Sequence, residues 1–249
     1  MLGAQRKTHL LDILSREGRV VAKSVARQLG VSDDSIRRDL RELADAGRVI
    51  RVYGGALPVP AADRPVGERR TLATASKERV ARRAAELIRP GSTIVLDAGT
   101  TTLAMTRLLP HGANLTVITP SPTIALAVAD HSEARVIIIG GELDRYSSVA
   151  GGALAMEAIR HIAADTFFLG VTGVDPEQGL TTGSLDDAVT KRAITERCAD
   201  TIVLASEEKI GAVSRFPVIG FDAVTEIISD PHDQNSLIPE LMGRITGRQ

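Results

Sequence analysis

The chain reads Val31-Ser32-Asp33-Asp34-Ser35-Ile36-Arg37-Arg38-Asp39-Leu40 near its N-terminus, and this stretch predicts the start of an amphipathic helix. Ser32 is a good N-cap residue, because its hydroxyl can accept a hydrogen bond from a free N–H group of the first turn. Ile36, Leu40 and Leu43 follow at helical spacing and form one apolar stripe. Hydroxyl and guanidinium groups lie largely off that stripe, as in a helix that reads the major groove. They belong to Ser35, Arg37, Arg38 and Arg41.

The residues around this helix predict the rest of a winged helix-turn-helix. Amphipathic helices are expected over Lys7–Glu17 and Ala22–Leu29, and Gly30-Val31 then forms the tight turn. Gly47 stands where a glycine often ends a helix, and Arg48–Gly55 alternates like a β-hairpin wing. A small helical core with a solvated charged face is the alternative, but the wing and the arginine positions favour DNA. The candidate DNA-binding residues are Ser32, Ser35, Arg37, Arg38, Arg41 and Arg51.

Composition and charge favour a protein without membrane contact whose N-terminal part is basic. The 249 residues are 43% hydrophobic and carry a net charge of −1. Residues 1–60 hold 11 Lys and Arg against 7 Asp and Glu, whereas the remainder holds 19 against 24. Residues 1–60, called the head below, are therefore basic, and the remainder, called the body, is acidic. A basic segment of this kind suits contact with a phosphate backbone. No apolar run approaches the roughly 20 residues that cross a bilayer, and no signal peptide is recognisable, so we expect a cytoplasmic protein without membrane contact.

No metal, cofactor or catalytic residue is expected. The single Cys198 excludes disulfide frameworks and cysteine-rich metal sites. The five histidines are scattered without ligand spacing, at positions 9, 111, 131, 161 and 232. The phosphate-binding and nucleophile motifs GxxxxGK[ST], GxSxG, HExxH and GxGxxG are all missing from the sequence.

The sequence predicts two domains joined by a linker. Residues 1–57 form the DNA-binding domain, and 58–75 form a linker that begins with three prolines in eight residues. Residues 76–249 form an α/β domain. Its expected strands are Thr93–Ala98, Leu115–Thr119, Arg135–Ile139, Thr166–Gly170, Thr201–Ala205 and Val224–Ser229. Its expected helices include Ser76–Ile88, Thr102–Leu109, Thr123–Ala129, Leu154–Ile162 and Asp186–Cys198. Apolar strands alternating with helices predict a mostly parallel sheet covered on both faces.

Unusual polar residues follow one strand after another, where parallel sheets bind ligands. Asp97 can accept from sugar hydroxyls, while glycines let a ligand approach the backbone and helix N–H groups can hold an anion. Lys191 and Lys209 can pair with phosphate charge. Each feature alone is more often a connector, a surface salt bridge or a solvated lysine, but their recurrence favours a site for a phosphorylated, hydroxyl-rich small molecule. The candidate effector-binding residues are Asp97, Gly99, Thr100, Thr101, Gly140, Gly141, Gly170, Asp187, Lys191 and Lys209.

The sequence resembles the DeoR family of bacterial transcriptional regulators along nearly its whole length. In the head the resemblance rests on Val31-Ser32, Ile36 through Leu40, Leu43, Gly47, Ile50-Arg51 and Tyr53 through Ala56. In the body it rests on Asp97 through Thr101, Gly140-Gly141-Glu142, Phe168 through Val171, Gly173, Lys191-Arg192-Ala193 and Lys209. The resemblance implies a sensor fold akin to ribose-5-phosphate isomerase and the coenzyme A transferases. It also implies a repressor of sugar uptake and metabolism genes that binds operator DNA as a homodimer or homotetramer and responds to phosphorylated sugars.

Four positions depart from the family pattern. Ser35 replaces a usual Thr, Pro120 a common Asn, Asp187 a usual Glu, and Ser206 a usual Asp. The Ser206 change puts in doubt the role of that carboxylate in ligand binding, and together the four suggest an altered effector preference.

Two other functions stay open at this point. The chain could be a sugar-phosphate isomerase that also binds DNA, for which Asp97, Glu142 and Asp187 are the plausible general bases. It could also be a constitutive DNA-binding protein whose body only oligomerises.

Overall fold

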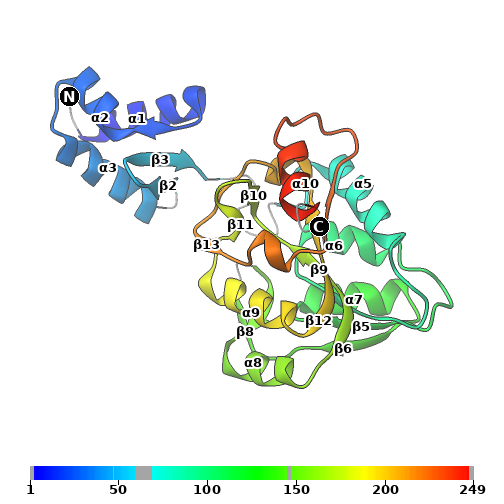
Figure 1. Ribbon diagram of the computed structural model, residues 1–249. Coiled ribbons are helices and arrows are strands. Elements are labelled where there is room, and N and C mark those ends of the chain that lie inside the picture. Colours follow the sequence, from blue (N-terminus) through cyan, green and yellow to red (C-terminus); the bar gives the residue numbers. More distant parts are fainter. Residues whose placement is uncertain (1–2, 47, 60–68, 145–146, 247–249) are drawn as a thin grey trace. The chain divides into compact units, whose positions relative to one another are not determined.

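The computed structural model describes residues 3–46, 48–59, 69–144 and 147–246 (Figure 1). The chain separates into two compact units, Met1–Val59 and Pro60–Gln249. Each unit has its own hydrophobic core, so each is described by itself.

The N-terminal unit is a winged helix-turn-helix, as the sequence predicted. Its elements are α1 (Gly3–Glu17), β1 (Val20–Val21), α2 (Ala22–Leu29), α3 (Asp33–Asp45), β2 (Val49–Val52) and β3 (Gly55–Pro58). The first helix begins four residues before the predicted start, and α2 has the predicted bounds. Gly30 adopts a left-handed conformation and ends α2, which makes the tight turn before α3. Gly47, the predicted C′ glycine, lies outside the described residues.

Helix α3 is held by its apolar stripe and by a buried ion pair. Ile36, Leu40 and Leu43 are buried in the core with residues of α1 and α2. Asp39 is also buried, on the same side of the helix, where both its carboxylate oxygens accept from the Arg6 guanidinium of α1. An aspartate in the middle of a DNA-binding sequence is therefore a packing residue that fixes α3 against α1.

The wing contains one strand that the sequence did not predict. Val20 and Val21 pair with Ala56 and Gly55, so β1, β3 and β2 form a three-stranded antiparallel sheet. A Cβ at Gly55 would lie 1.8 Å from the carbonyl oxygen of Val20, so only glycine allows this approach.

The C-terminal unit is built on a six-stranded parallel sheet of order β14-β12-β9-β4-β5-β6. All six of the predicted strands are present, with ends shifted by a few residues. They are β4 (Thr93–Leu96), β5 (Thr116–Thr119), β6 (Arg135–Ile138), β9 (Ala164–Gly170), β12 (Cys198–Ala205) and β14 (Glu226–Ser229). This confirms the predicted α/β class with a parallel sheet.

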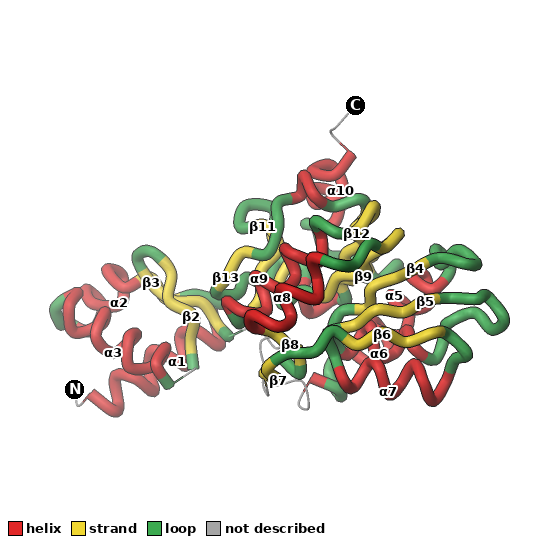
Figure 2. Tube along the Cα trace, turned by 90° about the horizontal axis from the view of Figure 1, so that it is seen from below, coloured by secondary structure: helices red, strands yellow, loops and turns green. Residues whose placement is uncertain are grey.

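Helices cover both faces of this sheet (Figure 2). One face packs against α5 (Thr74–Ala85), α6 (Thr100–Thr106) and α7 (Pro122–His131). The other packs against α8 (Gly152–Arg160), α9 (Leu185–Thr195) and α10 (Ile238–Thr246). Neighbouring residues of a strand point to opposite faces, so Phe167 of β9 enters one core cluster and Phe168 the other.

Several elements of this unit were missed or misplaced by the sequence analysis. The helix predicted over Asp186–Cys198 ends at Thr195, and Cys198 already begins β12. Small antiparallel sheets also stand beside the main sheet. One joins β10 (Gly173–Asp175), β11 (Gly179–Thr182) and β13 (Phe216–Pro217), and the other joins β7 (Glu142–Asp144) and β8 (Val149–Gly151). Helix α10 was not predicted. Among the described residues, no helix has the length and apolar character of a membrane span.

The packing of α3 gives a stability prediction. Leu40 is 2% exposed in the core of the N-terminal unit, so Leu40→Ala should lower the unfolding free energy of that unit by about 2–5 kcal/mol. Leu154 is 75% exposed on α8, so Leu154→Ala is the control and should change little. Thermal unfolding monitored by calorimetry checks both variants. An unchanged transition in Leu40→Ala would contradict the assigned core.

Candidate functional site

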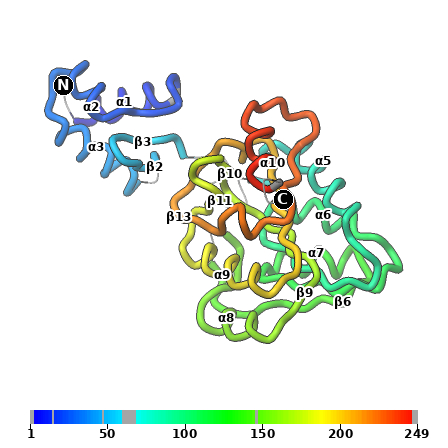
Figure 3. Tube along the Cα trace, viewed as in Figure 1, coloured from blue at the N-terminus to red at the C-terminus, as the bar shows by residue number. Residues whose placement is uncertain are grey.

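A pocket lies where the order of strands in the sheet reverses. After β4 the chain runs through α6 to β5 and β6 on one side, and it later returns to β9 on the other side of β4, as the labelled strands of Figure 2 show. Figure 3 follows the same path by colour along the chain. In open α/β sheets such a switch point leaves a crevice at the carboxyl ends of the strands. Here the loops after β4, β9 and β12 surround a pocket of about 560 Å³, including its open mouth.

Most of the residues predicted for effector binding meet in this pocket. Its lining includes Gly99, Thr100, Thr101, Gly170, Asp187, Lys191 and Lys209. Asp97 lies directly behind the lining, because its carboxylate accepts from Lys191 and from the N–H groups of Gly170 and Ala98. The first residues of α6 supply the threonines, since that helix begins at Thr100 and not at the predicted Thr102.

The predicted Gly140 and Gly141 are not in the lining of this pocket. They follow β6, which is separated from β4 by β5, so roughly 10 Å of sheet lies between the two strand ends. Gly141 has a φ of 152°, and a Cβ there would lie 2.3 Å from the carbonyl oxygen of Gly151. The structure therefore gives Gly141 a packing role between β7 and β8.

Lys191 is held between two carboxylates. Its Nζ lies 2.5 Å from Asp97 Oδ2 and 3.0 Å from Asp187 Oδ1, and all three side chains are buried. The Thr182 hydroxyl donates to the second oxygen of Asp187 at 2.5 Å. Burial disfavours the charged form of Lys191, but the two carboxylates outweigh it and raise the pKa of its ammonium group. Lys191 is thus a fixed positive charge in the pocket wall.

The surroundings of Lys209 lower the pKa of its ammonium group, whereas those of Lys191 raise it. Its Nζ donates to the Leu204 carbonyl oxygen at 3.0 Å, and its side chain is buried. Burial lowers the pKa of this ammonium group to about 8, and the nearby cations Arg69 and Lys77 act in the same direction. An anion bound beside Lys209 would stabilise its charged form.

Hydroxyl groups make up much of the remaining wall. Thr101 is buried in the lining, and its Oγ1 has no hydrogen-bond partner among the described residues. Buried hydroxyls without a partner are uncommon, so this atom is suited to accept or donate a bond to a ligand. The candidates named from the sequence leave out ten lining residues, six of which have polar side chains: Arg69, Thr102, Ser147, Thr172, Thr182 and Ser184. Thr172 follows β9 and could have been found from the strand-end argument, whereas nothing in the pattern indicated Arg69.

Two family departures lie near the pocket without lining it. The Pro120 carbonyl oxygen accepts from the Ala150 N–H at 2.8 Å, so this residue ties β5 to β8. Ser206 is buried, and its hydroxyl donates to Glu208 Oε1 at 3.0 Å.

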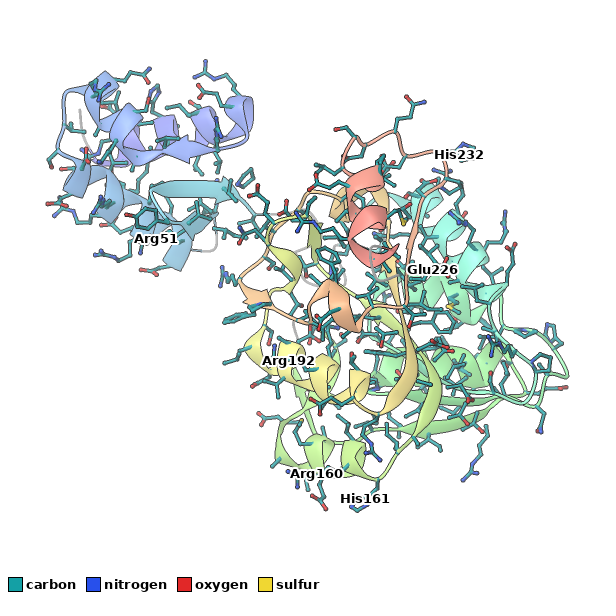
Figure 4. The ribbon with its side chains drawn as sticks, viewed as in Figure 1. Arg51, Arg160, His161, Arg192, Glu226 and His232 are labelled. Atoms are coloured by element: carbon teal, nitrogen blue, oxygen red, sulfur yellow. The ribbon has the colours of Figure 1, made fainter. Side chains whose placement is uncertain are left out.

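The N-terminal unit presents the predicted DNA-binding residues on one helix and the wing. The Ser32 hydroxyl caps α3 by accepting from the Ser35 N–H at 3.2 Å, and the two hydroxyls lie 3.0 Å apart. Arg37, Arg38 and Arg41 are exposed on α3. Arg51 is exposed on β2 and is labelled in Figure 4. The tip of the wing carries the fully exposed Tyr53, which the sequence analysis did not include.

The described residues contain no cluster of three or more His, Cys, Asp or Glu side chains that could hold a metal ion. Burial raises the pKa of the Cys198 thiol to about 12, so little of it is thiolate at neutral pH.

Comparison with known proteins gives matches over both units. The model of the DeoR C-terminal sensor domain matches residues 72–231, and that of the DeoR-like helix-turn-helix domain matches residues 6–59. The transcriptional regulator GlpR of Haloferax volcanii is 33% identical over 92% of this chain and 91% of its own length. The glycerol-3-phosphate regulon repressor of Escherichia coli K12 is 30% identical over 95% of this chain and all of its own.

Solved structures resemble the chain more distantly. A ribose 5-phosphate isomerase from Methanocaldococcus jannaschii covers 54% of this chain and 53% of its own, with 18% identity and a TM-score of 0.40. A resemblance at that level carries no information about activity.

The buried triad gives a second stability prediction. Lys191→Met leaves Asp97 and Asp187 buried without their shared cation, so the C-terminal unit should lose about 3–5 kcal/mol of unfolding free energy. Arg160→Met removes an exposed cation from the end of α8, where Arg160 is labelled in Figure 4, and should change little. Denaturant unfolding at pH 7 measures both effects. Equal midpoints for the two variants would contradict a structural role for Lys191.

Proposed function

The chain belongs to the DeoR family of DNA-binding transcriptional regulators, and we propose that it is a repressor of sugar uptake or carbohydrate metabolism genes that a phosphorylated sugar controls. The observation that carries the proposal is the pocket at the switch point of the sheet. Arg69, Lys191 and Lys209 bring three cationic side chains to a wall that is otherwise rich in hydroxyls and glycines.

The chemistry of this wall supports a phosphorylated sugar over a neutral one. Lys209 has no carboxylate bonded to its ammonium group in the described structure, and a phosphate can provide that charge through a charge-assisted hydrogen bond. The Thr101 hydroxyl can bond the sugar. In this proposal Gly99, Thr100 and Gly170 let the ligand approach the backbone, while Asp97 and Asp187 act mainly by holding Lys191.

The exposed arginines of α3 support the assignment of the operator-binding face. We assign base and phosphate contacts to Ser32, Ser35, Arg37, Arg38, Arg41 and Arg51. One head of fewer than 60 residues makes a small footprint, so we expect two heads on one operator and hence a homo-oligomer.

An isomerase activity is disfavoured by the state of the carboxylates. A general base must reach the substrate in its free form. Asp187 already pairs with Lys191 and accepts from Thr182, and Asp97 lies behind the lining with three donors. Glu142, the third candidate, is exposed and is not among the lining residues.

The proposal is tested with the full-length protein and a duplex selected from random sequence by the protein itself. Glycerol 3-phosphate belongs in the panel because a relative is named for that regulon, together with hexose and pentose phosphates and their unphosphorylated forms. One phosphorylated compound should raise the melting temperature and weaken operator binding, by roughly 5- to 150-fold for a typical coupling. Its unphosphorylated form should do neither. Operator affinity that no compound changes would favour the constitutive alternative, and interconversion of a sugar phosphate would favour the isomerase.

The lowered pKa of Lys209 predicts how ligand binding depends on pH. Protonated Lys209 favours the anion, and a phosphate monoester is largely a dianion above its second pKa of about 6. Affinity should therefore be highest between about pH 6 and 8 and fall about tenfold by pH 9, because Lys209 loses its proton above about 8. Titration calorimetry at pH 7 and 9 measures this. In Lys209→Arg the charge persists, so a folded variant should show a much weaker pH dependence; equal wild-type affinities at the two pH values would refute the role of Lys209.

The arginines of α3 give a prediction for operator recognition. Arg37→Ala or Arg38→Ala should cost about 1–3 kcal/mol of operator binding if the side chain contacts a base, with a smaller loss on random DNA. Arg16 is an exposed arginine at the end of α1 that we do not assign to DNA, so Arg16→Ala is the matched control. Fluorescence anisotropy with both duplexes distinguishes the variants. Full operator affinity in both α3 variants would disprove the assignment.

A further inference from the structure

Arg69 lines the pocket although it follows no strand of the sheet. It lies within residues 58–75, the linker predicted from the sequence, and it is the first described residue after residue 59. Every other cation of the lining comes from the body of the fold, Lys191 from α9 and Lys209 from the turn after β12. Arg69 alone among the lining cations is therefore close in sequence to the DNA-binding unit.

A buried lysine holds the turn that contains Arg69. Lys77 Nζ, on α5, donates to the carbonyl oxygens of Arg69 at 2.9 Å and Leu72 at 2.5 Å. The Leu72 N–H also donates to the Arg69 carbonyl oxygen, at 3.2 Å, and this bond closes the turn. The end of the linker is thus attached to α5 by the Lys77 side chain, which holds the backbone of Arg69 in place.

The same lysine connects the turn to the loop that carries Lys209. Lys77 Nζ lies 3.2 Å from Glu208 Oε1, which also accepts from the Ser206 hydroxyl. Glu208 precedes Lys209, so one buried ion pair behind the pocket lining joins the Arg69 turn to the β12 loop. The Arg69, Lys77 and Lys209 cations are near enough to influence one another, and the Glu208 carboxylate acts on both lysines.

We propose that Arg69 binds the anionic group of the effector, and that the Arg69–Leu72 turn transmits effector binding to the segment that carries the DNA-binding unit. The inference rests on the proposed function. A guanidinium group suits a phosphate because its N–H groups form two parallel charge-assisted bonds. A ligand changes operator affinity only if it prefers one arrangement of the protein, and a contact to the linker turn supplies that preference.

The binding part is tested with inorganic phosphate and glucose 6-phosphate on the full-length protein. Arg69→Gln should weaken the binding of both probes about tenfold, the loss expected for one charge-assisted contact. Arg70 is an exposed residue of the same turn and is not in the pocket lining, so Arg70→Gln makes the same charge change as a control. It should bind both probes within about twofold of the wild type. Wild-type affinity in Arg69→Gln overturns the assignment, whereas failure of the wild-type protein to bind any phosphorylated compound overturns the proposed function itself.

The transmission part is tested on the wild-type protein by amide hydrogen exchange, which does not depend on a variant that folds. Saturating glucose 6-phosphate, or the panel compound that binds best, should slow exchange at the Leu72 amide, because a bound anion holds the Arg69 turn closed. The Val80 and Ala81 amides in the middle of α5 serve as the internal reference and should not change. In Arg69→Gln the slowing at Leu72 should be lost. Ligand binding that leaves Leu72 exchange unchanged refutes this route.

Discussion

The placement of one buried ammonium group determines the architecture of the site. Lys191 of α9 lies between Asp97, at the end of β4, and Asp187, one turn earlier on its own helix. Asp97 also accepts from the Gly170 N–H at the end of β9, and Asp187 accepts from Thr182 of β11. Three buried charges are costly unless each is paired and hydrogen-bonded, so their partners must stay in place. One ion triad therefore fixes the strand ends, the helix and the small sheet around the pocket.

The ion triad gives Lys191 and Lys209 different roles in binding an anionic effector. Lys191 offers a charge that its carboxylates already stabilise, whereas Lys209 is buried and has its pKa lowered, so an incoming anion has more to gain beside Lys209. The departure at Ser206 lies behind the same wall. Its hydroxyl donates to Glu208, which in turn pairs with Lys77, so this position orients the network behind the pocket. A change of effector preference at Ser206 would act through that network and not through direct contact.

A buried ion pair also fixes the geometry of the DNA-binding unit. An apolar stripe alone would leave α3 free to rotate or slide against α1, but the Arg6–Asp39 pair specifies one register. Buried ionic groups can provide such specificity even where they add little stability. Fixing the buried side of α3 also fixes the direction of the exposed one, which carries Arg37, Arg38 and Arg41.

Hydrophobic periodicity and strand-end loops are local patterns, so the sequence alone predicted the winged helix-turn-helix, the six strands of the parallel sheet, the α3 stripe and seven of the residues that line the pocket. It could not give the order of the strands, which depends on long-range packing. That order placed Gly140 and Gly141 two strands from β4, and it brought Thr172 and Lys209 to the pocket. The Asp187–Lys191 pair is local to α9. Asp97 reaches Lys191, and Arg69 reaches the pocket lining, only through the tertiary fold, because these contacts join residues far apart in the chain.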